Sequence, residues 1–198
     1  MPLLWSLAAG ASAFYLALVG AGRKHPVKVA PALLLAAATF DVSPVASAGL
    51  VFCALGDGLL LDKERRFLHG LGAFLVGHLL LIGAFVVAGW EFLPPAALGG
   101  LGTLLLVAIA GVLGVLWKRL HGVLRLAVPL YAATLGAMVV AAGTHSAMAL
   151  AGAVVFVVSD SVLAINHFTR RFRGAEMIVM VTYYSAILAI AGSFLQFS

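Results

Sequence analysis

The sequence predicts an all-α protein that lies in a membrane as a bundle of about eight transmembrane helices. First, 64% of its 198 residues are hydrophobic and only 10% are charged, whereas a soluble domain is about 45–50% apolar and about 25% charged. Second, the mean hydropathy is +1.15. Third, apolar runs long enough to cross a bilayer, roughly 20 residues each, follow one another along the chain and leave no room for a separate soluble domain.

Charges, prolines and glycine pairs divide this single transmembrane domain, residues 1–198, into eight apolar spans. The first span holds no charged residue and is predicted to be a retained helix rather than a cleaved signal. The second is short and is expected to be tilted or interfacial. Helices are predicted because their backbone hydrogen bonds are satisfied internally within lipid. The predicted spans are 3–21, 27–40, 44–61, 67–89, 93–116, 123–142, 146–167 and 175–196.

The basic residues predict how these spans are oriented. If the loops between consecutive spans are numbered along the chain, all twelve Lys and Arg residues lie in or next to odd-numbered loops, and none lies in an even-numbered loop. Because cytoplasmic loops carry the excess of Lys and Arg, the odd loops are expected in the cytoplasm and both termini on the outer side, in the plasma (inner) membrane if the chain is bacterial. The net charge of +5 is therefore a topological signal, and no nucleic-acid partner is expected. The basic residues are Arg23, Lys24, Lys28, Lys63, Arg65, Arg66, Lys118, Arg119, Arg125, Arg170, Arg171 and Arg173.

A short motif occurs twice in the chain. Gly49-x7-Asp57 reappears as Gly152-x7-Asp160, and an Arg-Arg-Phe triplet follows each copy. Parallel internal repeats of this kind occur in membrane transporters. The repeat is compatible with two parallel halves of four helices each.

Two carboxylic acids, Asp57 and Asp160, lie inside apolar spans. An ionised group at the bilayer centre costs about 2.5–3.5 kcal/mol, so such residues are functional candidates. At the helical rise of about 1.5 Å per residue, they lie about 9 Å and about 15 Å from the nearest basic loop, and His78 lies about 18 Å from its own. Other polar residues predicted in or beside this layer are Tyr131, Ser159, Asn166, Tyr183 and Tyr184.

Two buried carboxyls favour proton chemistry. An apolar cavity keeps one carboxyl neutral while its partner stays ionised, which supplies a general acid and a general base. The alternatives are a proton-coupled transporter that uses the same Asp and His residues, and a metal-dependent lipid hydrolase. The chain has no His-Glu-x-x-His motif and one cysteine, Cys53, so no metal or other cofactor is expected. No Gly-x-Ser-x-Gly motif of a serine hydrolase is present either.

Five segments of the sequence carry a family resemblance. They are GLVFCALGDGLLL at 49–61, GLGAFLVGH at 70–78, VPLY at 128–131 with Met138, GAVVFVVSDSVLA at 152–164 with Phe168, and TYYSA at 182–186. Together, in this order from about residue 45 to the C-terminus, they resemble the YhhN family of membrane proteins, the lysoplasmalogenases. Two positions depart from the pattern, since Leu81 replaces a frequent tyrosine and Ile187 a frequent glutamine.

The resemblance implies hydrolysis of the vinyl ether bond of a lysoplasmalogen, a lysophospholipid, to a fatty aldehyde and glycerophosphocholine or glycerophosphoethanolamine. This reaction needs one acid and one base, because protonation of the alkene gives an oxocarbenium ion that water captures. Asp160 is the expected proton donor and Asp57 the expected base, or the reverse, with His78 as the third catalytic residue. The expected substrate-binding residues are Tyr131, Ser159, Asn166, Tyr183 and Tyr184, together with Lys28 and Arg125 at the phosphate.

Overall fold

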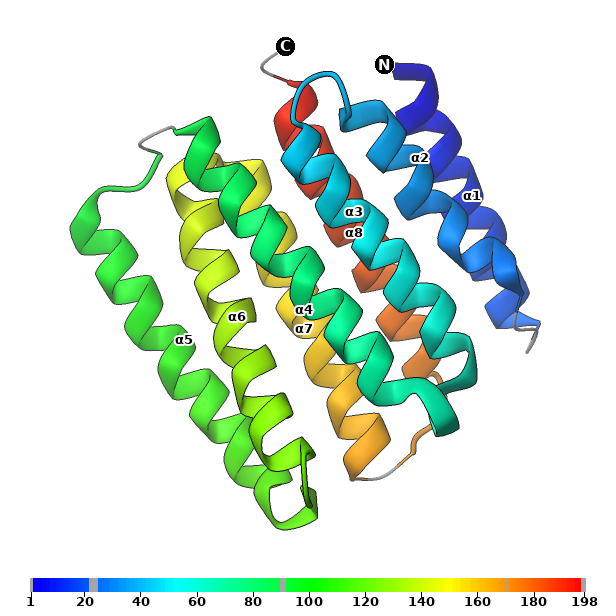
Figure 1. The fold of residues 1–198 in the computed structure, drawn as a ribbon, viewed down its shortest axis with the longest axis vertical. Helices are drawn as coiled ribbons and strands as arrows, with labels where there is room; N and C mark the ends of the chain where they lie inside the picture. Colours follow the sequence, from blue (N-terminus) through cyan, green and yellow to red (C-terminus); the bar gives the residue numbers. More distant parts are fainter. Residues whose placement is uncertain (1, 22–24, 90–91, 170, 197–198) are drawn as a thin grey trace.

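The computed structural model describes residues 2–21, 25–89, 92–169 and 171–196, and these form the expected α-helical bundle (Figure 1). Within them, seven helices are long and apolar enough to cross a membrane, and an eighth helical segment, Pro26–Thr39, is shorter. No strand occurs in the described ranges. The prediction of an all-α, multi-pass membrane protein is confirmed.

Each predicted span contains or overlaps one α-helix. The helices are α1 (Pro2–Gly20), η1 (Pro26–Val29), α2 (Ala30–Thr39), α3 (Pro44–Leu59), η2 (Leu60–Asp62), α4 (Lys63–Ala88), α5 (Pro95–Leu116), η3 (Trp117–Arg119), α6 (Leu124–His145), α7 (Ala147–Phe168) and α8 (Ala175–Leu195), where η marks a 3-10 helix. The largest difference is at α4, which begins at Lys63 rather than at residue 67. The four additional residues, 63–66, are all charged, so the apolar run alone did not predict them.

Proline and serine residues begin several helices. Pro44 occupies the first turn of α3, where the Ser43 side chain accepts a hydrogen bond from the Ala46 N–H. Ser146 accepts one from the Ala149 N–H at the start of α7. The N–H groups in the first turn of a helix have no hydrogen-bond acceptor within the helix. Proline fits there because it has no N–H, and the oxygen of a preceding serine accepts a hydrogen bond from one of the unpaired N–H groups. These local signals mark where α3 and α7 begin.

The second span is divided between η1 and α2, which hold 4 and 10 residues. Together they extend about 23 Å, less than the hydrocarbon thickness of about 30 Å. The segment is therefore shorter than a helix that crosses the hydrocarbon region at right angles to it. Its basic residue, Lys28 in η1, is buried and only 4% exposed, so the short helix brings a cation into the protein interior.

The two halves of the chain are built alike. Helices α1 and α5 run in the same direction, and α3 packs on α4 as α7 packs on α8 (Figure 1). A Cβ atom at Gly49 would lie 3.0 Å from the Gly77 carbonyl oxygen, and one at Gly152 would lie 3.0 Å from that of Ala186. The repeated glycine thus allows the same close approach between two helices in each half.

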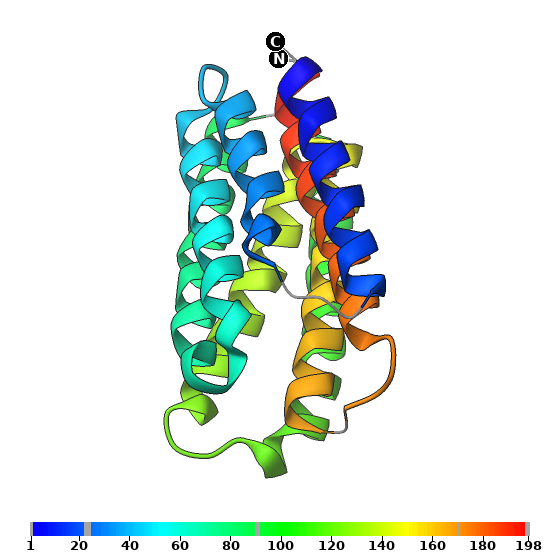
Figure 2. The same ribbon diagram turned by 90° about the vertical axis from the view of Figure 1, so that its right-hand side faces the viewer.

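Both chain termini lie at one end of the bundle (Figures 1 and 2). At the opposite end, called the basic end below, lie the start of α4 with Arg65, η3 with Lys118 and the segment before α8 with Arg171. Arg23, Lys24 and Arg170 are outside the described residues. The predicted alternation of basic and non-basic loops therefore agrees with the direction of the helices.

Helix α5 lies at the edge of the bundle. It packs mainly on α6, and Leu116 is its buried residue. The other long helices contribute side chains to one large hydrophobic core. The peripheral position of α5 leaves an apolar space between it and the rest of the bundle, at the level where the predicted site residues lie.

Candidate functional site

Asp160 of α7 lies where two cavities adjoin. The larger, of about 110 Å³, is bordered by α4, α5, α6 and α7. The smaller, of about 20 Å³, is bordered by η1, α3, η2, α4, α7 and α8. Asp160 and Phe74 line both cavities. This carboxyl group can therefore contact molecules held in either space.

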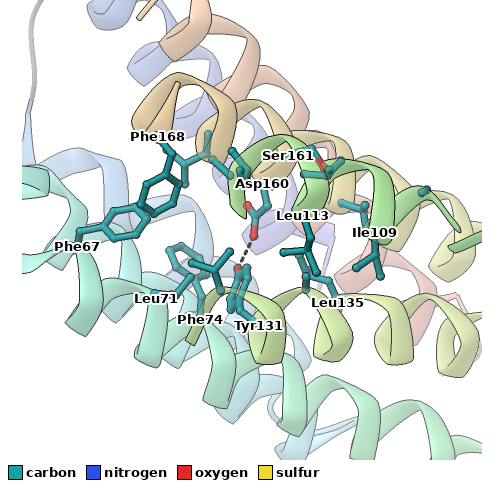
Figure 3. A pocket seen from close by; sticks show the side chains of 18 of the residues that line it. Phe67, Leu71, Phe74, Ile109, Leu113, Tyr131, Leu135, Asp160, Ser161 and Phe168 are labelled. Atoms are coloured by element: carbon teal, nitrogen blue, oxygen red, sulfur yellow. Dashed lines mark hydrogen bonds between the residues drawn. The ribbon is translucent and has the colours of Figure 1, made fainter. Parts of the chain in front are cut away.

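The larger cavity has almost entirely apolar walls. Figure 3 shows Phe67 and Leu71 of α4 on one side of Asp160 and Ile109 and Leu113 of α5 on the other. The polar side chains that line it are those of Tyr131, Asp160 and Ser161. A cavity that is apolar except for a few convergent polar groups suits a hydrocarbon chain with one reactive group.

Tyr131 contacts Asp160 directly. Its hydroxyl donates a hydrogen bond to Oδ2 of Asp160, which joins α6 to α7 (Figure 3). The spacing of the sequence predicted these two residues in one layer of the membrane, and the structure brings their side chains together. The phenol limits the orientations that the Asp160 carboxyl can adopt.

Asp57 forms an ion pair with Lys28. The distance from Lys28 Nζ to Asp57 Oδ1 is 3.0 Å, and the two side chains are 5% and 1% exposed. The Tyr184 hydroxyl donates a hydrogen bond of 3.1 Å to the Lys28 carbonyl oxygen, which anchors η1 to α8. The sequence predicted Lys28 at the rim, where it would contact a phosphate. The structure places it inside the bundle instead, paired with Asp57.

The smaller cavity is lined by polar groups from several elements. Lys28, Asp57, Ser159, Asp160 and Tyr183 all border it. The Tyr183 ring is 2% exposed and packs edge-on against Phe74, with ring centroids 5.9 Å apart. The two aspartates predicted to act together therefore face one small polar space, next to the apolar cavity.

His78 lies behind Tyr131 in an aromatic cluster. It is fully buried, and its ring centroid is 5.4 Å from that of Tyr131 and 4.6 Å from that of Phe156. Both of its ring nitrogens lack a hydrogen-bond partner within the described part of the chain. His78 lies on α4, and its described contacts are with aromatic rings rather than with either aspartate.

Two further candidates form hydrogen bonds that hold the backbone in place. Ser159 Oγ donates a bond of 3.0 Å to the Val179 carbonyl oxygen, which joins α7 to α8. Asn166 Oδ1 accepts a bond of 3.1 Å from the Phe172 N–H in the loop after α7. Ser159 still borders the smaller cavity, whereas Asn166 lies at the basic end and lines neither cavity.

Arg125 lies on the first turn of α6, at the basic end. Its Nε donates a hydrogen bond of 2.9 Å to the Leu120 carbonyl oxygen, and its guanidinium carbon lies 5.8 Å from the centre of the Trp117 ring. These two contacts hold an exposed guanidinium near the basic end of the larger cavity, which Leu116 and Val128 line.

The structure also identifies site residues that sequence reasoning missed. Phe74 lines both cavities and stacks on His78, with ring centroids 6.3 Å apart, and Ile109 and Leu113 line the larger cavity from the α5 side. An apolar residue gives no sequence signal that distinguishes a cavity wall from a lipid-facing surface. Within the described ranges, no three His, Cys, Asp or Glu side chains gather in a way that could hold a metal ion.

The fold and the cavities show the class of this protein: it is a polytopic α-helical membrane protein with carboxyl groups at a buried apolar cavity. Residues 23–194 match the YhhN family, and the chain therefore belongs to that family. The resemblance noted in the sequence is confirmed, and the match begins early enough to include η1 and Lys28. No solved structure matches the chain.

Several relatives of known name support the same assignment. The chain is 33% identical over 176 residues to lysoplasmalogenase TMEM86B of Homo sapiens, covering 86% of this chain and 74% of that protein. It is 37% identical over 151 residues to lysoplasmalogenase TMEM86B of Sus scrofa, covering 75% and 62%. A lysoplasmalogenase of Mycobacterium tuberculosis (strain CDC 1551 / Oshkosh) is 31% identical over 151 residues, covering 73% and 58%. The chain thus spans about three-fifths to three-quarters of these relatives.

The two departures from the family pattern lie in the core. Leu81 and Ile187 are fully buried, and neither lines the larger or the smaller cavity. Leu81 packs against Gly49, where a Cβ atom would lie 3.1 Å from its Cγ. Both positions therefore lie in the packing between helices rather than in the walls of the candidate site.

Proposed function

We propose that this protein hydrolyses the vinyl ether bond of a lysoplasmalogen inside the membrane. The observation that carries the proposal is the position of Asp160, at the junction of an apolar cavity and a small polar one. The alkenyl chain lies in the apolar cavity, so that its double bond reaches the carboxyl group. The names of the relatives, all lysoplasmalogenases, support this substrate class.

The proposed reaction uses two carboxyl groups and water. A carboxylic acid donates its proton to the alkene carbon remote from the ether oxygen, and an oxocarbenium ion forms. Water adds to the carbon that bears the ether oxygen and gives its proton to a carboxylate. The resulting hemiacetal breaks its bond to the glycerol oxygen, which takes up a proton, and a fatty aldehyde is released. Acid–base catalysis of this kind accelerates a reaction by about 10²–10⁴-fold.

The surroundings of Asp57 and Asp160 support this chemistry. Carboxylate groups beside the reacting carbon stabilise the positive charge that develops there, and they do so more strongly where water is excluded. Tyr131 holds Asp160, and Lys28 holds Asp57. We propose that both aspartates act on the substrate and that His78 acts indirectly, by supporting the Tyr131 ring.

We propose that the phosphate of the headgroup lies at Arg125. Six bonds separate the vinyl ether carbon from the phosphorus atom, which is roughly 7 Å at about 1.2 Å per bond. Arg125 precedes Tyr131 by six residues, or about 9 Å along the helix. A substrate with its double bond at Asp160 thus places its phosphocholine or phosphoethanolamine near this guanidinium. The basic end then faces the cytoplasm, where membrane proteins concentrate Lys and Arg.

The test supplies purified protein with matched lysoplasmenyl and lysoacyl lipids and measures aldehyde and fatty acid. We expect aldehyde alone from the wild type, and a loss of about 10²-fold or more in Asp57→Asn and Asp160→Asn. Asp62→Asn is the matched control, because Asp62 is exposed and lies near the same helix end. Release of fatty acid, or full activity in both variants, contradicts the proposal.

A proton-coupled transporter, the other function that the sequence allowed, would move its substrate into liposomes along a pH gradient without cleaving it. The names of the relatives do not favour that function. The same purified protein, reconstituted in liposomes, distinguishes the two by whether its lipid substrate is recovered intact or as an aldehyde.

A further inference from the structure

We propose that Lys28 is a positioning residue that makes Asp57 the base of the reaction and leaves Asp160 as the acid. The inference rests on the proposed function, which by itself allows either order of the two aspartates. It also replaces the role of phosphate ligand that the sequence suggested for this lysine.

The two carboxyl groups have different partners. Lys28 Nζ lies 3.0 Å from Asp57 Oδ1, and both side chains are almost completely buried. A buried charge is retained only where an opposite charge accompanies it, so this contact joins an ammonium to a carboxylate. Asp160 instead accepts a hydrogen bond from the neutral Tyr131 phenol. As a carboxylate, Asp57 can accept a proton and act as the base. The reaction then requires Asp160 to be the group that donates a proton.

The backbone holds Lys28 in this position. The Lys28 N–H donates a hydrogen bond of 3.1 Å to the His25 carbonyl oxygen, and the His25 ring accepts one of 3.2 Å from the Val27 N–H. The Lys28 carbonyl oxygen accepts a further bond from Tyr184. These contacts fix both ends of η1, so the ammonium is directed toward α3 rather than toward the membrane surface.

The smaller cavity supplies the place where the base acts. Its volume of about 20 Å³ suits one water molecule, which requires about 10–15 Å³ and several polar partners. Lys28, Asp57, Asp160 and Tyr183 provide those partners. We assign this cavity to the hydrolytic water, which lies between the ion pair and the carboxyl group that faces the substrate.

The proton balance closes with this assignment. Asp160 protonates the alkene carbon, and Asp57 takes a proton from the water that adds to the oxocarbenium ion. When the hemiacetal breaks, its hydroxyl proton goes to Asp160 and Asp57 gives its proton to the departing glycerol oxygen. Both aspartates return to their starting states, and Lys28 remains charged throughout.

The experiment compares two substrates that share the vinyl ether. Lysoplasmenylcholine carries a phosphate, and 1-O-alkenylglycerol does not. We expect Lys28→Met to lower kcat by about 100-fold on both substrates, with each KM changed less than about threefold. Arg125→Gln is the control for phosphate binding, and it should raise the KM of lysoplasmenylcholine alone by about tenfold, the loss expected for one charge-assisted contact.

A double variant keeps the test decisive if Lys28→Met leaves the Asp57 charge buried and the protein unfolds. Lys28→Met/Asp57→Asn removes both charges, and we expect it to be no slower than Asp57→Asn alone, because Lys28 acts only through Asp57. Two results would overturn the positioning role of Lys28. One is a double variant that is slower than Asp57→Asn by a further large factor, and the other is a Lys28→Met variant whose only defect is a raised KM for lysoplasmenylcholine. If the wild type releases aldehyde from neither substrate, the proposed function itself fails.

Discussion

Tyr131 and Asp160 join helices α6 and α7 at the wall of the apolar cavity, through a hydrogen bond from the phenol to Oδ2 of the carboxyl group. Because Oδ2 accepts the hydrogen bond from the phenol, we expect the acidic proton of a neutral Asp160 on Oδ1. The bond therefore determines which oxygen of the proposed acid can reach the substrate.

Tyr131→Phe is expected to lower kcat by about 10- to 100-fold while the protein remains folded. The variant keeps the ring that packs against His78 and removes only the hydroxyl, whose hydrogen bond contributes about 1 kcal/mol to stability. Aldehyde release and thermal unfolding in detergent measure the two effects. Tyr15→Phe is a suitable control, because Tyr15 is buried in α1 and lines neither cavity. Equal losses in the two variants would contradict a special role for Tyr131.

His78 is expected to act through its volume. His78→Ala leaves a void beside Tyr131 and Phe156, which should destabilise the protein by about 2–5 kcal/mol and slow turnover. His78→Phe fills that void and should recover most of both losses. A His78→Phe variant that folds normally but releases no aldehyde would show that the imidazole itself takes part in the chemistry.

The wall of the apolar cavity formed by α5 can be tested with two substitutions on one helix. Ile109 lines the cavity, whereas Val107 is 67% exposed on the outer surface. Ile109→Trp places a bulky ring where the alkenyl chain is proposed to lie. The rate on long-chain substrates should therefore fall by about tenfold or more, because overpacking a filled site costs about 1–3 kcal/mol. Val107→Trp adds the same bulk outside and should leave the rate within about twofold. Similar rates in the two variants would show that the alkenyl chain of the substrate lies outside this cavity.

The helices were predictable because a bilayer allows few structures for an apolar chain. An apolar run of a given length must become a helix, and Ser43 and Ser146 mark where two of these helices begin. Depth was predictable too, since helical rise converts sequence separation from a basic loop into distance. For this reason Tyr131 and Asp160 were expected in one layer, and the structure joins them.

The partners of the polar residues were not predictable in the same way. Which face of a helix meets its neighbour depends on packing between elements far apart in the chain, as for Lys28 and Asp57. The position of Lys28 inside a predicted apolar span was the available signal for a buried ion pair. Under the positive-inside rule, however, the same lysine indicates only the orientation of the helices. Ser159 and Asn166 look equally suited to substrate binding, yet both bond to the backbone.

The internal repeat yields a prediction about stability. Gly49 and Gly152 occupy matching positions in the two halves, and at each a Cβ atom would lie 3.0 Å from a backbone oxygen of the adjacent helix. Backbone cannot move aside as a flexible side chain can, so Gly49→Leu and Gly152→Leu should each destabilise the protein by about 1–3 kcal/mol. Gly111→Leu on α5 is the control, because a Cβ atom at Gly111 would have open space around it, with no atom of a neighbouring helix in the described ranges within 4 Å. Thermal unfolding of the three variants in one detergent measures the difference. If Gly111→Leu is as unstable as the other two, the loss comes from substituting any helical glycine, and the repeated motif has no special part in packing the two helices of each half.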